Sequence, residues 1–99
     1  MAVIKGERFR VLEDHAIAGL SQWRAPFTGS FECFLPAGLL LVCRNEQKPG
    51  AVGFSCVPED YESGERLLVP KEDREHPQYN GYYLVLMEAE IGTWFDRAS

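Results

Sequence analysis

The sequence predicts a small, mainly β domain, and a few features carry that prediction. Short apolar runs recur along the chain with the two-residue alternation of half-buried strands. Two of these runs meet at a Leu35-Pro36-Ala37-Gly38 turn, where Pro36 presets φ for the first central position of a β-turn and Gly38 suits the exit. With 99 residues the chain has the length of one domain, which we assign to residues 1–99.

Five segments have the pattern of strands. They are residues 6–12, 30–35, 39–43, 52–56 and 81–87. The runs 39–43 and 81–87 are apolar on both faces, which is typical of strands covered on two sides, and the second is expected in the centre of a sheet. In the other three segments the alternation places Phe9, Phe31 and Phe54 in the core, and Val52 and Cys56 are expected on the same inward face as Phe54.

Residues 13–29 lose the alternation and are expected to form a long loop that packs back on the body. Residues 58–68 are ambiguous. Pro58 suits the first position of a helix and acidic residues follow it, so we expect a short helix or helical turn there, and an α+β fold is the alternative. A second Pro-led acidic turn is expected at residues 70–74.

Near the end of the chain, Ile91, Trp94 and Phe95 have the i, i+3, i+4 spacing of one helical face. This spacing predicts a helical turn that caps the core. A closing strand is the alternative, because Gly92 suits either structure.

Short strands, a long first loop, a diverging Pro-Ala-Gly turn and a late helical turn together resemble a small SH3-like five-stranded barrel with one or two short helical turns. The resemblance is one of topology and covers about four-fifths of the chain by this layout. The ALYDY-type motif of peptide-binding SH3 domains is missing, since the first strand reads FRVLEDH. Recognition of proline-rich peptides is therefore not implied.

Composition excludes several classes of partner. Fifteen acidic and ten basic residues give a formal net charge of −5, which argues against nucleic acid, because nonspecific binding to phosphates needs clustered Lys and Arg. No apolar run approaches the length of a membrane helix, and no signal peptide is apparent, so we expect no membrane association. Three cysteines in apolar runs suit a reducing compartment, and a cytoplasmic location is expected.

Motifs for catalysis, metals and cofactors are missing from the sequence. Cys33 and Cys56 fall on inward positions, where burial makes a thiol inert. Cys43 ends a strand beside Arg44, a cation that can favour the thiolate, but a structural role is expected for Cys43 as well. His15 and His76 are the candidates for acid–base chemistry, but neither lies in a metal-ligand or triad pattern. We therefore expect no enzyme activity, no metal and no cofactor.

Aromatic and acidic residues outside the expected core are the candidates for binding a partner. Trp23, Tyr61 and Tyr79 lie in polar surroundings, where an amphipathic ring either closes one end of the core or lines a groove. The candidate partner-binding residues are Trp23, Tyr61, Tyr79, Asp60, Glu62 and Asp14.

Three functions remain open from the sequence. The first is a noncatalytic module that binds a protein, and a basic protein is one option. The second is an acidic inhibitor or immunity-type protein that neutralises a basic toxin or enzyme through charge. The third is a small enzyme or ligand carrier with a pocket at the mouth of the barrel and His15 or His76 as its acid–base group. The sequence leaves the oligomeric state open.

Overall fold

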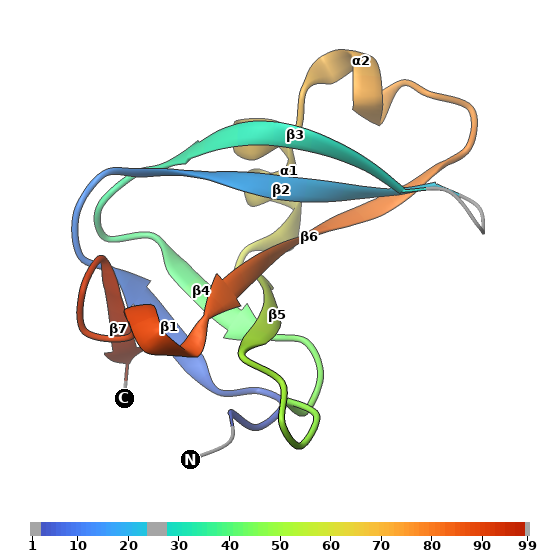
Figure 1. Cartoon of the computed structure of the whole chain (residues 1–99). Helices are drawn as coiled ribbons and strands as arrows, with labels where there is room; N and C mark the ends of the chain where they lie inside the picture. The colour runs from blue at the N-terminus through green and yellow to red at the C-terminus, as the bar shows by residue number, and fades with distance from the viewer. Residues whose placement is uncertain (1–2, 24–27, 99) are drawn as a thin grey trace.

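The computed structural model describes residues 3–23 and 28–98, and the side chains of Trp23 and Thr28 lie outside this description. One antiparallel sheet of seven strands dominates it, in the order β3-β2-β6-β5-β4-β1-β7 (Figure 1). The strands are β1 (Arg8–Val11), β2 (His15–Trp23), β3 (Thr28–Leu35), β4 (Leu40–Cys43), β5 (Gly53–Pro58), β6 (Tyr79–Met87) and β7 (Phe95–Ala98). The helices are α1 (Tyr61–Leu68), α2 (Lys71–Arg74) and the 3-10 turn η1 (Glu88–Glu90). The mainly β fold class is confirmed.

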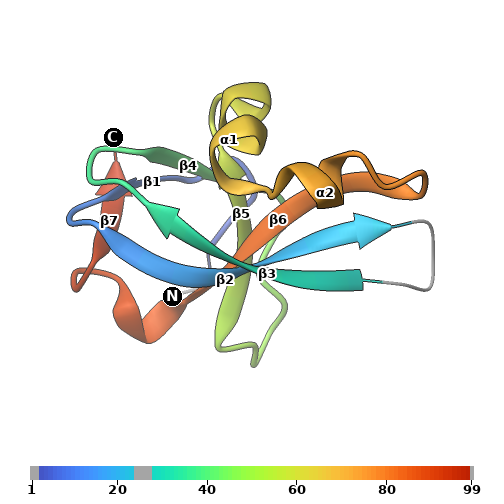
Figure 2. The same ribbon diagram turned by 90° about the horizontal axis from the view of Figure 1, so that it is seen from above.

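The closed five-stranded barrel is not what the structure contains. Within the described chain the sheet has seven strands and does not close, so β3 and β7 form its two edges. The additional strands are β2 and β7, both of which fall in segments without a clear strand pattern. Helices α1 and α2 connect β5 to β6, and Figure 2 shows α1 beside β5 and α2 beside β6.

Strand β2 replaces most of the loop expected at residues 13–29. It pairs with β3 over eight residue pairs and with β6 on its other side. The alternation is hidden because its buried positions hold Gly19 and Ser21 instead of large apolar residues. A Cβ on Gly19 would lie 2.5 Å from the Phe31 ring, and the Ser21 hydroxyl donates a hydrogen bond to Asp73 Oδ2 at 3.0 Å. Phe31 thus occupies the space that a side chain on β2 would fill.

The Pro-Ala-Gly turn separates two strands that are not neighbours in the sheet, as a diverging turn requires. Its hydrogen bond runs from Leu39 N–H to Pro36 O at 3.2 Å, one residue later than the sequence suggests. Gly38 therefore takes the third position, with a φ of 91°, which is typical of a type II turn. The Asp14 carboxylate accepts a hydrogen bond from Ala37 N–H at 2.9 Å and secures the turn.

The ambiguous segment at residues 58–68 is a helix from Tyr61, but Pro58 ends β5 instead of starting the helix. Asp60 is the N-cap, since its side chain accepts a hydrogen bond from Ser63 N–H. The expected turn at residues 70–74 is confirmed as α2. Val52 precedes β5 and is 68% exposed, so its expected inward position is wrong.

The C-terminal segment forms a strand, not a helical face. Residues 88–90 make a 3-10 turn, Gly92 N–H donates to Phe95 O at 2.7 Å, and β7 then pairs with β1. Trp94 and Phe95 are nevertheless buried, as a segment that caps the core must be.

Phe9, Phe31 and Phe54 are buried as expected. The Phe9 ring centroid lies 5.1 Å from that of Phe54 and 5.7 Å from that of Phe95, so β1, β5 and β7 meet in one core. Among the described residues, none of the helices has the length and apolar character to cross a membrane.

Candidate functional site

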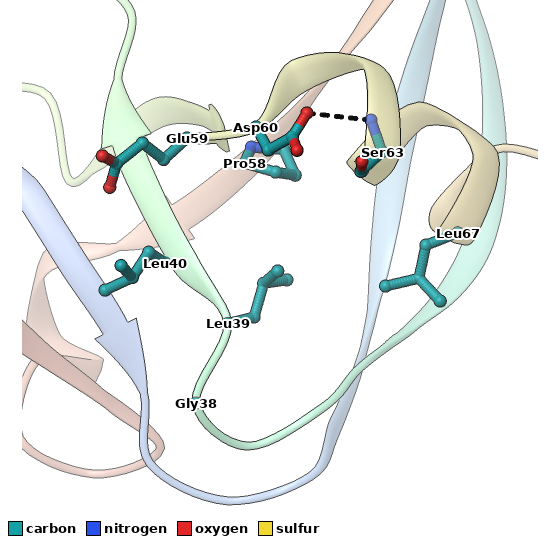
Figure 3. Close-up of a pocket in the computed structure, with 9 residues that line it drawn as sticks. Gly38, Leu39, Leu40, Pro58, Glu59, Asp60, Ser63 and Leu67 are labelled. Atoms are coloured by element: carbon teal, nitrogen blue, oxygen red, sulfur yellow. Dashed lines mark hydrogen bonds between the residues drawn. The ribbon is translucent and has the colours of Figure 1, made fainter.

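A groove of about 430 Å³ lies between the start of β4 and helix α1 (Figure 3). Its lining residues are Gly38, Leu39, Leu40, Pro58, Glu59, Asp60, Ser63, Gly64 and Leu67. One side comes from the diverging turn and β4, and the other comes from the end of β5 and the first two turns of α1. Segments about twenty residues apart in the chain thus form its two walls.

Backbone contacts hold these walls at a fixed separation. Glu59 N–H donates to Leu40 O at 2.9 Å, which ties the start of the helical segment to β4. Gly38 N–H donates to Val11 O at 2.7 Å and ties the turn to β1. Gly64 is buried where α1 crosses Pro58, and a Cβ there would lie 2.5 Å from the Pro58 Cβ. Glycine therefore allows the helix to approach the strand closely.

The groove has an apolar interior that is open to solvent. Leu67 is 59% exposed, and Figure 3 shows the Leu39 and Leu67 side chains extending into the space between the two walls. Leu39 and Leu40 are partly buried, and Pro58 is buried beneath them in the sheet. Covering exposed apolar surface in a concavity with an apolar group lowers the free energy.

Carboxylates border this apolar interior. Glu59 is half exposed and accepts two hydrogen bonds from Arg8, at 2.7 Å from Nη2 and 3.1 Å from Nε. Asp60 is exposed, and hydrogen bonds from the Ser63 backbone and side chain, with Arg66 nearby, hold the pKa of its carboxyl below the ordinary value. Asp14 lies beside the turn that supplies Gly38. The groove therefore combines apolar walls with a rim of negative charge.

The contribution of the N-cap Asp60 to stability is expected to depend on pH. We expect Asp60→Ala to lower the Tm at pH 7, because α1 loses the acceptor for an N-terminal N–H group. The folded-state pKa of Asp60 is lowered, so its stabilisation is present above the ordinary carboxyl pKa and is lost as pH falls through the folded value. Thermal unfolding from pH 7 to pH 2.5 should show the Tm difference between wild type and variant shrinking in acid. A difference that grows in acid would contradict this assignment.

Among the candidate partner-binding residues, Tyr61 and Tyr79 lie close together where α1 meets β6. The Tyr82 hydroxyl donates to Tyr61 O at 3.0 Å, Tyr82 N–H donates to the Tyr61 hydroxyl at 3.2 Å, and their ring centroids are 4.8 Å apart. The Tyr79 hydroxyl donates to Glu65 Oε2 at 2.8 Å. Burial raises the pKa of both Tyr79 and Tyr82. These tyrosines attach α1 to the sheet, and Tyr61 keeps 39% of its surface exposed.

The other candidates have separate positions. Trp23 pairs with Tyr79 through the β2–β6 backbone register, and its side chain lies outside the described residues. Asp60 lines the groove, Asp14 contacts the turn at its edge, and Glu62 is exposed in the first turn of α1. Sequence reasoning missed the apolar groove residues. The signal available was Leu67, which follows Arg66 and precedes Leu68: on a short helix with few apolar residues, two adjacent leucines lie on different parts of the surface and one of them can stay exposed.

The cysteine and histidine candidates are placed away from the groove. Cys43 is buried and burial raises its pKa, which favours the expected structural role over an activated thiolate beside Arg44. The His15 ring stacks on Trp94 with centroids 4.2 Å apart, and His76 Nδ1 accepts a hydrogen bond from Gln78 N–H. Within residues 3–23 and 28–98, no group of three or more His, Cys, Asp and Glu side chains has the geometry to hold a metal ion.

The chain matches no protein family model, no curated protein and no solved structure. The basis for a functional assignment is therefore the groove itself: its apolar walls, its size and the carboxylates at its rim.

Proposed function

We propose that this protein is a noncatalytic interaction module, and that its groove binds a short segment of a partner protein in which an apolar side chain stands next to Arg or Lys. One observation carries the proposal. Leu67, an exposed apolar side chain, faces a concave surface whose rim bears the carboxylates of Glu59 and Asp60. We place the protein in the cytoplasm, since its three cysteines are free.

The size of the groove favours a peptide segment over a large rigid surface. A volume of about 430 Å³ accommodates one or two large side chains, and the groove is open to solvent. Covering Leu67 and its apolar neighbours supplies the main free energy of binding, because transfer of such a side chain from water contributes about 1.5–3 kcal/mol.

The negative charge at the rim favours a partner segment in which Arg or Lys stands next to the apolar side chain. The chain carries a net charge of −5, and Asp60, Glu59 and Asp14 all lie on or beside the rim. Glu59 is paired with Arg8, but it stays half exposed and keeps one carboxylate oxygen for a second cation. Such rim charges act mainly on the association rate and on the choice of partner, and salt weakens them.

A phage-displayed library of random dodecapeptides is the probe for this proposal. Selection on the wild-type protein is expected to enrich peptides with Leu, Ile, Met or Phe within two positions of Arg or Lys. We expect Leu67→Glu to weaken binding of a selected synthetic peptide by at least about tenfold, because the apolar contact is lost and a negative charge enters the groove. Asp60→Asn should reduce the salt dependence of binding.

Phe34→Glu is a matched control for Leu67→Glu. Phe34 and Leu67 are equally exposed at 59%, but Phe34 is on β3 and does not line the groove. The control should bind the selected peptide like wild type. Peptides that bind equally to wild type and Leu67→Glu would contradict the groove proposal. Salt-sensitive binding to a folded basic protein that is indifferent to Leu67 would instead support the acidic inhibitor alternative.

A further inference from the structure

Two of the three free cysteines lie directly opposite each other on neighbouring strands. Cys43 on β4 and Cys56 on β5 are partners in the antiparallel register. Arg44 N–H donates to Ser55 O at 2.9 Å, while Cys43 N–H points to the other side of β4 and donates to Glu7 O at 2.8 Å. This pattern makes Cys43 and Cys56 a non-hydrogen-bonded pair, the type in which opposing residues come closest.

The spacing of such a pair is compatible with a disulfide. Opposing Cα atoms in a non-hydrogen-bonded pair are about 4.5 Å apart, and a disulfide accepts about 4.4–6.8 Å between Cα atoms. Both side chains are buried on the same face of the sheet, with 2% and 0% exposure. The thiols are therefore aimed into the same space, and the cross-link needs side-chain rotation with little movement of the strands.

We propose that Cys43 and Cys56 form a reversible disulfide when the protein meets hydrogen peroxide. The Cys43 thiolate attacks one peroxide oxygen, the O–O bond breaks, and hydroxide leaves to become water, which gives a sulfenic acid. The Cys56 thiolate then attacks the Cys43 sulfur, the S–O bond breaks, and the second oxygen leaves as water. Two thiols and one peroxide give one disulfide and two waters. A dithiol reductant reverses the step by thiol–disulfide exchange.

The order of attack follows from the position of the pair in the ladder. Leu41, Val42 and Cys43 pair with Pro58, Val57 and Cys56, so Cys43 lies near the loop end of the ladder, with the Arg44 N–H to Ser55 O hydrogen bond between this pair and the connecting loop. The Cys43 thiol donates to Asn45 O at 2.9 Å, and Asn45 itself is exposed. Local opening at the loop end therefore reaches this pair early, and Cys43, whose thiol contacts the exposed Asn45, gains access to solvent more readily than Cys56. Burial raises the pKa of both thiols, and oxidation is therefore slow while this end stays closed.

Cys33 does not belong to this pair. It lies on edge strand β3 opposite Ile17, and β2 and β6 separate β3 from β5 in the sheet. Burial raises its pKa to about 11. In the native protein Cys33 is expected to remain a free thiol when the cross-link forms.

Peroxide treatment of the native full chain, compared with the chain unfolded in about 8 M urea, tests the proposal. In the native protein we expect an intact mass lower by two hydrogen atoms, one remaining thiol, and a single cross-linked peptide that joins residues 43 and 56. In urea all three cysteine pairings can form. Cys33 and Cys43 are closer in sequence than Cys43 and Cys56, so the 33–43 disulfide is expected at least as often as the 43–56 disulfide. The cross-linked native protein should melt on the order of 10 °C higher, because the closed loop restricts the unfolded chain.

Cys33→Ser should keep the cross-link, and Cys43→Ser should form none within the chain. Circular dichroism establishes that both variants are folded before oxidation, and Cys33→Ala replaces Cys33→Ser if the hydroxyl prevents folding. Three thiols that persist after peroxide treatment of the native protein, oxygen addition without a cross-link, or a native cross-link to Cys33 would each overturn the proposal.

Discussion

Replacing Trp94 by alanine is expected to lower the free energy of unfolding by about 4 kcal/mol, the middle of the range for removing a buried aromatic side chain. Trp94 is 2% exposed, and its ring centroid lies 4.2 Å from that of His15 and 4.5 Å from that of Phe95. Its carbonyl oxygen also accepts from Leu12 N–H at 2.8 Å, so the residue just before β7 is tied to the residue just after β1. Urea denaturation followed by circular dichroism measures the change.

Trp94→Phe separates the loss of the ring from the loss of the indole N–H. Trp94 Nε1 is buried, and no described residue accepts its hydrogen bond. Removing an unsatisfied donor offsets part of the lost packing, so we expect Trp94→Phe to cost about 1–2 kcal/mol. If Trp94→Ala stays within about 1 kcal/mol of wild type, the C-terminal segment does not contribute to the core as the structure implies.

Strand prediction succeeded where large apolar residues alternate and failed where small residues are buried. Phe9, Phe31 and Phe54 reveal their strands because the inward face is filled by the strand's own side chains. On β2 the corresponding positions are Gly19 and Ser21, and the space is filled by Phe31 from the neighbouring strand. A periodic pattern read along one strand cannot detect a core position that another strand fills.

Whether the sheet closes could not be predicted from the sequence, for a related reason. The Pro-Ala-Gly turn predicts divergence, and β3 and β4 do diverge, but divergence fits both a closed barrel and an open sheet. The outcome depends on how β2 and β7 pair. Both strands were hidden, one by small residues and the other by the helical spacing of Ile91, Trp94 and Phe95.

The candidate site was predicted in part, from its charges and not from its apolar groups. Asp60 and Asp14 were selected as surface acids, and the structure places both near the groove. Leu39 and Leu40 lie in a run that looks like a fully covered strand, and their partial exposure depends on where α1 crosses β5. That crossing is a property of tertiary packing, and it centres on one glycine.

Gly64→Ala tests this crossing, and we expect it to lower the free energy of unfolding by about 2 kcal/mol. A new Cβ would lie 2.5 Å from the Pro58 Cβ and 2.7 Å from the Tyr82 hydroxyl, and the proline ring cannot move aside. Overpacking of this kind costs about 1–3 kcal/mol, and the close approach to a rigid ring places Gly64 at the upper end. The higher helix propensity of alanine offsets about 1 kcal/mol of this cost. The clash is the larger effect, so the net change is destabilising.

The same substitution links the packing of α1 to the groove. Because the helix must move away from Pro58 to admit the methyl group, the wall that carries Leu67 moves with it, and peptide selected on wild type should bind the folded variant more weakly. Glu62→Ala is the control, since Glu62 is exposed on the same helix and its replacement leaves the crossing unchanged; stability should change by less than about 0.5 kcal/mol. If the Gly64→Ala protein is as stable as wild type, α1 does not approach β5 as closely as the structure places it. If the variant is destabilised but binds the peptide with unchanged affinity, the position of the helix does not set the geometry of the binding surface.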